Sequence, residues 1–491
     1  MRALLVVDNP KRWPLDIPGT ETIAARDYLT ERRYSELRGA KVFNLCRSYR
    51  YQSVGYYVSL LAEARGHRPL PSIATLQELR SRRVVKTLSE DLDERVQQLL
   101  KSLRSDDFTL SIYFGQNLAQ RYAPLAQALF SIFPAPLLRA RFERAGSRWE
   151  LRAVNVIGAN EIGDEHLGFI AEAAARHFQR ANPVRRRRNP RFDLAILVNP
   201  AEEEPPSNAR ALQRFERAAE AVGLSAAIIT QEDAGRLAEF DALFIRETTA
   251  VNHATFRIAS RAEAQGLVVI DDPRSIIRCT NKVFLAELLE RHEIATPRTL
   301  IVHRGNIDQI GEVCGFPCVL KAPDSAFSAG VIKVEDAPAL KAALEGFFAT
   351  SDLVVAQEFV PTDFDWRVGL IDGRPLYVCR YHMAKKHWQV IRRDESGQTA
   401  AEGAVDTLSV AEAPADIVRA ATRAANLIGD GLYGVDLKRV GRRAIVIEVN
   451  DNPNIDAGYE DRVLKDALYR EVMGSMLRRI MVRKRLDLES A

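Results

Sequence analysis

A predicted β-hairpin near the carboxyl end, YGVDLKRVGRRAIVIEVNDNP (433–453), constrains the fold of this chain more than any other stretch. Gly441 marks its turn, Asp436 lies on the first strand, and Glu448 and Asn450 end the apolar second strand. Strand residues two apart share a face, so Glu448 and Asn450 point together, with Asp436 on the paired strand. Packing explains this poorly, because an acid and an amide would lose water there without gaining partners. Three oxygen donors beside basic residues are what Mg²⁺ on nucleotide phosphates requires.

Alternating strand and helix patterns predict several domains. With 491 residues the chain exceeds the size of one hydrophobic core, so two to four domains are expected. Over 1–184, apolar runs of strand length such as 3–8 and 40–46 alternate with helical spacing, which predicts an α/β domain with a mostly parallel sheet. A second α/β unit is predicted over 193–275, where no GxGxxG supports a nicotinamide site.

Two basic segments are candidate anion sites, each with a structural alternative. RRRRNPRF (185–192) is either a polyanion-binding patch or a linker stiffened by proline, and the linker is favoured because no aromatic side chains alternate with the charges. CRSYRYQSVG (46–55) places polar and cationic groups between a strand and a helix start, which suits an anion. A tyrosine-rich packing loop explains the same residues equally well.

Composition narrows the class of protein. Hydrophobic residues make up 46% and charged residues 27%, as in ordinary globular proteins, and the net charge of +4 does not call for nucleic acid. Five cysteines without a CxxC pair suit a reducing cytoplasm, and Cys314 with Cys318 falls short of the four ligands of a zinc site. No apolar run of 18 residues exists, and MRALLVVDNP is too short for a signal segment. A cytoplasmic protein without a membrane partner is expected.

Lysines at a helix start and at a strand end mark a candidate phosphate site. Lys282 begins a helix with a buried face, and Lys321 ends the apolar run PCVLK (317–321). The next segment, APDSAFSAGVIKV (322–334), is rich in small residues that let backbone N–H groups approach phosphate. A lysine beside it would neutralise phosphate charge. Each feature is weak alone, and GxxxxGK[ST] is absent.

Arginines on two later strands are candidates for catalysis. Arg367 follows Asp365 by two residues, so the two share a strand face and the carboxylate can orient the guanidinium. Arg380 lies on the next predicted strand. The alternative is a surface ion pair, which would contribute little to stability.

In this order the features resemble the ATP-grasp superfamily, and most closely the RimK-type glutamate ligases. The resemblance covers about 193–485, and the first part is similar to the RLAN domain found ahead of some RimK-like ATP-grasp proteins. It implies an α/β and α+β multidomain protein in which two α+β subdomains enclose ATP. The implied parts are an RLAN-like α/β domain (1–184), a basic linker (185–192), a pre-ATP-grasp α/β domain (193–275), a central or lid subdomain (276–350) and a carboxyl-terminal subdomain with the Mg²⁺ site (351–491).

The resemblance also implies roles for individual residues. The implied nucleotide contacts are Lys282, Lys321, Ser325, Ser328, Gln357, Glu358, Phe359 and Val360. The implied ligands of one or two Mg²⁺ ions, with Mn²⁺ as an alternative, are Asp436, Glu448 and Asn450. Arg367 and Arg380 would face the transferred phosphate and the acyl phosphate. In such ligases a carboxylate attacks the γ-phosphate of ATP, and an amine then displaces phosphate to leave an amide, while the protein positions and neutralises charge.

Departures from the RimK pattern leave the substrates open. Gly330 is the one glycine of the loop 322–331, Asn454 stands where glycine is common, and YHMAKKHWQVI (381–391) lacks the usual Asn- and Gly-rich stretch. The expected activity is an ADP-forming carboxylate–amine ligase acting on small-molecule or peptide substrates, for example one that adds glutamate. An ATP-grasp regulator and a kinase without amide-bond formation are the alternatives. A nucleic-acid binder is disfavoured, and a homo-oligomer stays open.

Overall fold

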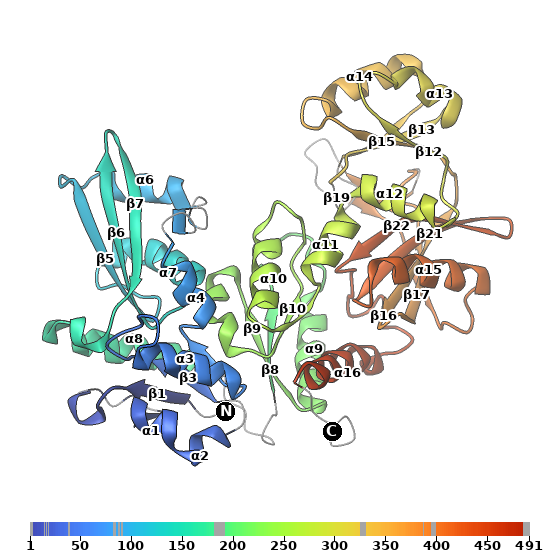
Figure 1. Ribbon diagram of the computed structural model, residues 1–491. Coiled ribbons are helices and arrows are strands. Elements are labelled where there is room, and N and C mark those ends of the chain that lie inside the picture. Colours follow the sequence, from blue (N-terminus) through green and yellow to red (C-terminus); the bar gives the residue numbers. More distant parts are fainter. Residues whose placement is uncertain are drawn as a thin grey trace. The chain divides into compact units, whose positions relative to one another are not determined.

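Two units make up the computed structural model, which describes residues 3–13, 15, 17, 19–37, 40–81, 85–86, 89, 92–180, 192–324, 330–385, 387–393 and 399–484. The first unit consists of Met1–Asn189 with Ile229–Asp241, and the second of Pro190–Ile228 with Ala242–Ala491 (Figure 1). The segment 229–241 thus packs with the first unit, although it lies inside the predicted pre-ATP-grasp domain. The predicted linker, 185–192, falls outside the described residues except for Phe192.

The first unit begins with a parallel sheet of order β2-β1-β3-β4, in keeping with its predicted α/β pattern. The strands are β1 Ala3–Val7, β2 Thr20–Ala24, β3 Lys41–Asn44 and β4 Arg68–Leu70. The helices of this part are α1 Ala25–Thr30, α2 Arg32–Ser35, α3 Val54–Ala64, α4 Ile73–Glu78 and α6 Asp93–Leu100.

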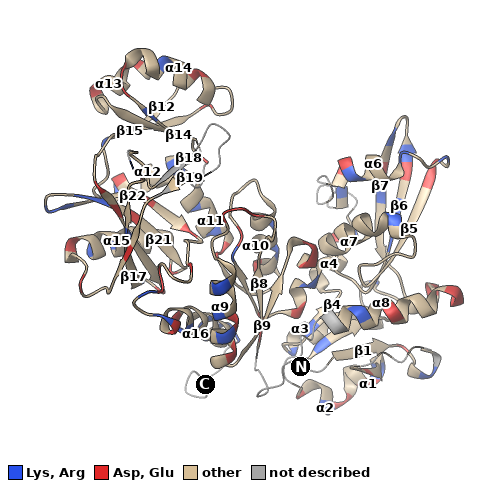
Figure 2. Cartoon of the chain, turned by 180° about the vertical axis from the view of Figure 1, so that it is seen from behind, with Lys and Arg blue, Asp and Glu red and all other residues tan. Residues whose placement is uncertain are grey.

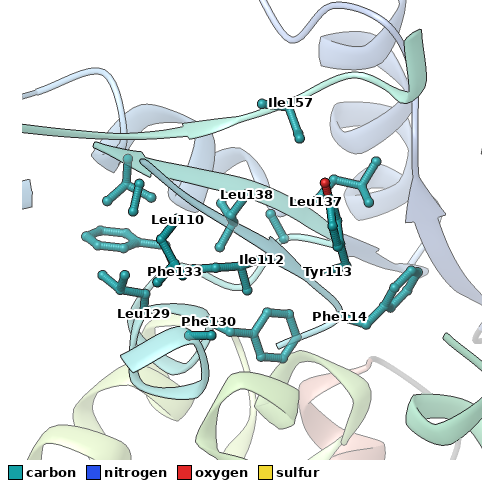
Figure 3. Close-up of a cluster of buried hydrophobic side chains, with 14 of the residues drawn as sticks. Leu110, Ile112, Tyr113, Phe114, Leu129, Phe130, Phe133, Leu137, Leu138 and Ile157 are labelled. Carbon is teal, nitrogen blue, oxygen red and sulfur yellow. The ribbon is translucent and has the colours of Figure 1, made fainter. Parts of the chain in front are cut away.

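An antiparallel sheet of order β5-β6-β7 completes the first unit. Its strands and helices are β5 Asp107–Tyr113, α7 Ala123–Ile132, β6 Leu137–Ala145, β7 Arg148–Val156 and α8 Leu167–Arg180. Apolar side chains of β5, α7 and β6 gather in its core, among them Leu110, Ile112, Leu129 and Leu138 (Figure 3). The 3₁₀ helix η6, Gln231–Glu239, packs against α7 and β4 and buries Leu237.

The second unit contains another four-stranded sheet, of order β11-β10-β8-β9, whose β8, β10 and β11 run parallel. Its strands are β8 Phe192–Leu197, β9 Leu224–Ile229, β10 Ala242–Ile245 and β11 Val268–Ile270. Its helices are α9 Ala209–Ala221, α10 Ala254–Ala264 and α11 Pro273–Thr280.

The four-stranded sheets of the two units are built alike. Reading β2, β1, β3 and β4 against β9, β8, β10 and β11 gives the same order of strands along the chain and across the sheet. The later elements repeat at a spacing of 200 residues, because α3 and β4 begin at residues 54 and 68, and α10 and β11 at 254 and 268. Ala62, Glu63, Ala64 and Gly66 recur as Ala262, Glu263, Ala264 and Gly266. The chain therefore contains one α/β arrangement twice.

A small antiparallel sheet of order β12-β15-β13-β14 follows, with two helices. Its elements are β12 Thr299–Val302, α13 Ile310–Val313, β13 Cys318–Lys321, β14 Val331–Val334, α14 Ala337–Phe347 and β15 Val354–Glu358. β15 lies beyond the predicted lid boundary at residue 350, but it pairs with both β12 and β13 and so belongs to this sheet.

A five-stranded antiparallel sheet of order β20-β17-β16-β21-β22 completes the second unit. The strands are β16 Phe364–Ile371, β17 Arg374–His382, β20 Val405–Leu408, β21 Tyr433–Val440 and β22 Arg443–Asp451. The helices are α12 Lys282–Arg291, α15 Ala415–Ile428 and α16 Asp466–Arg483, and β18 Ile391–Arg393 pairs with β19 Thr399–Glu402.

Two cores hold this sheet in place. On one side α12 and α15 contribute Leu285 and Ile417 to a core with β16 and β21. On the other, α16 packs against α9, and its Tyr469 joins a core that also contains Phe215 and Tyr377. No helix among the described residues is long and apolar enough to cross a membrane. Acidic and basic residues are distributed over both units (Figure 2).

Candidate active site

One cavity of about 380 Å³ in the second unit brings most of the predicted site residues together. It is lined by side chains from the small sheet, from the five-stranded sheet and from the loop after β10. The predicted residues that line it are Lys282, Lys321, Gln357, Glu358, Phe359, Val360, Arg367, Asp436, Glu448 and Asn450. Arg380 is not among its lining residues, and Ser325 and Ser328 lie outside the described residues.

The β21–β22 hairpin presents the predicted metal ligands as the sequence indicated. Asp436 stands directly opposite Glu448, and Gly434 opposite Asn450. The register shifts beside Asp436, so Ile447 is an extra residue of β22, and both Ile447 and Glu448 line the cavity. Gly434 is required here, because a Cβ atom at this position would lie 2.7 Å from the Pro453 side chain. The glycine of the GVD segment (434–436) is therefore required by its close contact with the proline of the EVNxxP segment (448–453).

A bidentate ion pair orients Arg367. Its Nε lies 2.6 Å from Asp436 Oδ1 and its Nη2 lies 2.7 Å from Oδ2. Burial alone would lower the pKa of Arg367, but Asp436 outweighs burial and raises that pKa well above its ordinary value. Burial also raises the pKa of Asp436, although Arg367 opposes this. Asn450 Nδ2 donates to Asp436 Oδ2 at 3.0 Å, so the arginine, the acid and the amide form one network.

The expected pairing of Asp365 with Arg367 is wrong. β16 and β21 are in register at Arg367 and Asp436, so the guanidinium meets the acid directly across the sheet. Asp365 instead accepts a hydrogen bond from Lys438 Nζ at 2.6 Å. Lys438 also lines the cavity and was not predicted. Its position two residues after Asp436 on the same strand is the signal that would have revealed it.

The two predicted phosphate lysines approach Glu448 from different elements. Lys282 is the first residue of α12, behind the N-cap Asn281, and its Nζ lies 3.2 Å from Glu448 Oε1. Lys321 ends β13 and is 8% exposed, and no ion pair or hydrogen bond of its amino group is found within the described ranges. Burial lowers the pKa of Lys321 to about 8, although Glu448 partly opposes this. Burial would raise the pKa of Glu448, but Lys282 and Lys321 together lower it.

The end of β15 and the two residues after it form one wall of the cavity. Phe359 packs edge-on against Trp388 at 5.9 Å between ring centroids, and Lys333 Nζ lies 4.3 Å from the Phe359 ring centroid. Gln357 Nε2 donates to Thr299 Oγ1 at 3.1 Å. The side chain of Glu358 turns to Arg298, whose Nε lies 3.0 Å away and lowers the pKa of Glu358. Phe359, Val360 and Trp388 give this part of the cavity an apolar lining, which suits the flat apolar faces of a purine ring.

Arg380 points to the other side of the five-stranded sheet. In the β16–β17 register Cys379 is opposite Arg367 and Arg380 is opposite Trp366, so Arg367 and Arg380 lie on different faces. Arg380 Nη2 pairs with Asp406 Oδ2 at 3.0 Å, and its guanidinium lies 5.4 Å from the Phe364 ring centroid. This placement does not support a role at the transferred phosphate. The sequence alone could not show the face, because the register of the hairpin was unknown.

The loop after β10 supplies site residues that were not predicted. Thr248 and Thr249 line the cavity, and Thr249 Oγ1 donates to Asp451 Oδ2 at 2.6 Å. The buried Arg246 fixes the same region, because its guanidinium donates to Asn452 Oδ1 at 2.7 Å and to the Pro453 carbonyl at 2.8 Å. Residues at the carboxyl end of a parallel strand often face a ligand, which is the signal that would have found them.

The donors at the hairpin fit a magnesium ion. Within the described ranges no three His, Cys, Asp or Glu side chains gather as a metal site by themselves. Asp436, Glu448 and Asn450 provide two carboxylates and an amide on paired strands of one cavity wall. Mg²⁺ is commonly bound by one or two carboxylates together with substrate phosphates and water, so this set is sufficient.

Comparisons with known proteins identify two domain families in this chain. The model of the RimK-like ATP-grasp N-terminal domain, RLAN, matches residues 25–173, and that of the RimK-like ATP-grasp domain matches residues 279–465. A probable alpha-L-glutamate ligase of Syntrophotalea carbinolica is 25% identical over 234 residues, which is 47% of this chain and 74% of that protein. The alpha-aminoadipate–LysW ligase LysX of Saccharolobus solfataricus is 29% identical over 219 residues, 43% of this chain and 75% of LysX.

Solved structures with similar folds include D-alanine–D-alanine ligase from Bacillus anthracis. It covers 60% of this chain and 99% of its own, with a TM-score of 0.46 and 17% identity. The resemblance predicted from sequence is confirmed by the two domain models, and with it the α/β and α+β ATP-grasp fold. The chain therefore joins an RLAN domain to a RimK-like ATP-grasp domain.

Proposed function

We propose that this chain is an ADP-forming ligase that joins a carboxylate to an amine through an acyl phosphate. The observation that carries the proposal is the single cavity in which two lysines, a fixed arginine and three oxygen donors meet. Alpha-L-glutamate ligases and LysX among the relatives support the same reaction class. The substrates are proposed to be small molecules or peptides.

In this proposal the nucleotide lies along β15 and the hairpin. The backbone of 357–360 faces the adenine edge, and Lys282 and Lys321 contact the phosphates. Lys321 suits this role because no ion pair of its buried amino group is found among the described residues, and Glu448 and Asp365 only partly oppose the effect of burial on its pKa. Burial disfavours the charged form of this amino group, and a phosphate bound beside it would stabilise that form.

The metal ligands are proposed to be Asp436, Glu448 and Asn450. A Mg²⁺ ion held there would supply positive charge to the phosphate oxygens of ATP. The chain's own contribution is to favour the charged forms of these acids, because Arg367 opposes the rise that burial causes in the pKa of Asp436 and the two lysines lower the pKa of Glu448.

Arg367 is proposed to stabilise the charge that develops during transfer. A substrate carboxylate oxygen attacks the γ-phosphorus, ADP leaves, and the amine nitrogen then attacks the acyl carbon while phosphate leaves with the amine proton. Asp436 holds the guanidinium by two hydrogen bonds, so Arg367 needs no reorganisation when charge develops. Arg380 is left out of the proposed catalytic set because it does not line the cavity.

The test is a screen for ADP release over paired carboxylates and amines, with mass spectrometry of the products. ADP that depends on both substrates, with an amide product, supports the ligase. ADP formed without an amine would identify a kinase, and nucleotide binding without turnover a regulator. Arg367→Gln should lower turnover at least 100-fold, whereas Arg380→Gln, on the other sheet face, should keep it within about threefold. Equal losses in both variants would contradict the assignment.

A further inference from the structure

We propose that the amine substrate is cationic, with a second ammonium group that stays charged during the reaction, as in a diamine or a basic amino acid. This inference rests on the proposed ligase function and names its amine substrate class. It follows from the uneven distribution of charge around the cavity, from the contacts of the acids on one side, and from the position of those acids relative to Arg367.

Among the described residues, all basic side chains that line the cavity lie on one side of it, where the phosphates of the nucleotide are proposed to bind. We call this the nucleotide side. The four cations are Lys282, Lys321, Arg367 and Lys438. Three of them pair with acids of the same wall, namely Glu448, Asp436 and Asp365. Lys321 remains, nine-tenths buried and directed into the cavity, and it marks this side for an anion such as phosphate.

The other side of the cavity carries acids without basic partners. It is formed by the loop after β10, by the end of β22 with the residues that follow it, and by Tyr381 of β17, and none of its described lining residues is Lys or Arg. Its acids are Asp451, Asp456 and Glu460. The hydroxyl groups of Thr248, Thr249, Tyr381 and Tyr459 lie among the same lining residues. Hydroxyls and carboxylates together offer acceptors to an ammonium group.

These acids are held by neutral donors rather than by cations. Asp456 Oδ1 accepts from the Asn208 backbone N–H at 2.6 Å, and Glu460 Oε2 accepts from the Asp456 backbone N–H at 2.7 Å. Burial raises the pKa of both carboxyl groups, as expected where no cation is in contact. The buried Arg246 lies behind this wall and offsets part of the charge, but its donors are taken by Ser207, Asn452 and backbone carbonyls.

One tyrosine connects this acidic side to the reacting centre. The Arg367 guanidinium lies 5.0 Å from the Tyr381 ring centroid, and the Tyr381 hydroxyl donates to Glu460 Oε1. An ammonium group held by Glu460 would therefore lie about one ring length from the proposed acyl phosphate. A second amine on the same molecule can reach the acyl carbon from there, in neutral form, and lose its proton to the departing phosphate.

Glutamate is a poor amine for this side of the cavity. Its two carboxylates would enter a wall that carries three acids and has no lysine or arginine among its described lining residues, so they would find no cation to pair with there. The relatives named for glutamate therefore do not predict the amine of this chain. Lysine and 1,5-diaminopentane carry the charge that the wall lacks, and norleucine matches lysine in length without the second ammonium.

The experiment measures binding of four probes to the full chain with Mg²⁺ and a non-hydrolysable ATP analogue. The probes are lysine, 1,5-diaminopentane, norleucine and glutamate. Lysine or the diamine should bind at least tenfold tighter than norleucine, and glutamate most weakly. Glu460→Gln or, as a less buried site, Asp456→Asn should reduce that preference at least fivefold. The control Glu345→Gln, an exposed acid on α14, should leave it unchanged.

Equal binding of lysine and norleucine, or tighter binding of glutamate, would overturn the inference whatever the variants do. The same probes are then tested for amide formation with a panel of carboxylates. Amide formation with glutamate but not with lysine or the diamine would leave the ligase function standing and reject the cationic amine. No amide and no amine-dependent ADP with any probe would instead reject the ligase function, while the binding preference would still decide the charge of the ligand.

Discussion

Replacing Lys321 by methionine should stabilise the fold and abolish ATP binding in the same variant. Lys321 lies at the end of β13 with 8% of its surface exposed, and its charge is held in the wall of the cavity. Methionine has a similar length and no charge, so it removes the burial cost of the ammonium group and keeps most of the packing. A residue retained at a cost in stability is what a phosphate-binding role predicts.

The magnitude follows from the lowered pKa. Burial lowers the pKa of Lys321 from 10.5 to about 8, and each pKa unit corresponds to about 1.4 kcal/mol, so the charged form costs about 3 kcal/mol at pH 7. Between pH 8 and 10.5 the unfolded chain binds more protons than the folded chain, so stability of the wild type should rise with pH there. The methionine variant should lack that rise.

Thermal unfolding and calorimetric titration with an ATP analogue provide the assay. We expect the melting temperature of the second unit to rise by roughly 5 °C at pH 7, and affinity for the analogue to fall at least 100-fold. Affinity of the wild type should decline as the pH rises above about 8, where the free lysine loses its proton. Lys341→Met, at an exposed position of α14, is the control. A lower melting temperature or an unchanged affinity would refute the reasoning.

Three further substitutions test other parts of the structure. Glu448→Gln should abolish Mg²⁺-dependent turnover while unfolding stays cooperative, and near-normal turnover in a steady-state assay would reject Glu448 as a ligand. Arg246→Met should destabilise the second unit by about 3 kcal/mol in urea titrations, because it leaves buried acceptors such as Asn452 unpaired; a loss under 1 kcal/mol would contradict this. Glu239 has a pKa well below its ordinary value, because Lys41 and His177 outweigh burial. Its contribution is therefore fully present above the ordinary carboxyl pKa of 4.5 and is lost as the pH falls from there towards the lower pKa of the folded state, so Glu239→Gln should destabilise the first unit at pH 7 and progressively less as the pH falls below 4.5. A constant difference across pH would exclude the ion pairs as the cause.

The hairpin at 433–453 could be predicted because strand geometry is local. Side chains alternate every second residue, so Glu448 and Asn450 had to share a face once the segment was a strand. The partner of Arg367 could not be predicted in the same way. It depends on the register between β16 and β21, which come together from positions 69 residues apart, and that register places Asp436 rather than Asp365 beside the guanidinium. The same lack of register information left the sheet face of Arg380 undetermined from sequence.

The repeat of the α/β arrangement could be found in the sequence. The sequence did not show that, within the described ranges, the loop after the third strand lines the active-site cavity in only one of the two units. The recurrence of Ala62-Glu63-Ala64 at a spacing of 200 residues required only a comparison of the chain with itself. In the second unit the loop after the third strand carries Thr248 and Thr249 into the cavity. In the first unit the equivalent loop, which follows β3, packs against Gly158. The contact is close, since a Cβ atom added to Gly158 would lie 2.8 Å from the Arg47 backbone. Repetition predicts the scaffold, and the loops decide the chemistry.

The two units of this chain are not two continuous stretches of sequence, so dividing the sequence at one point does not separate them. Residues 229–241 follow β9 of the second sheet in sequence, yet Glu239 pairs with Lys41 at 3.0 Å and with His177 at 2.9 Å in the first unit. The side chains of all three are at least four-fifths buried, so a cut at residue 184 would leave an unpaired acid and the apolar Leu237 without their partners. Composition marked the basic stretch at 185–192 as the natural place to divide the chain. The first unit does end within this stretch, at Asn189, but the buried ion pairs add the segment 229–241 to that unit, so residues of the first unit hold the segment between β9 and β10.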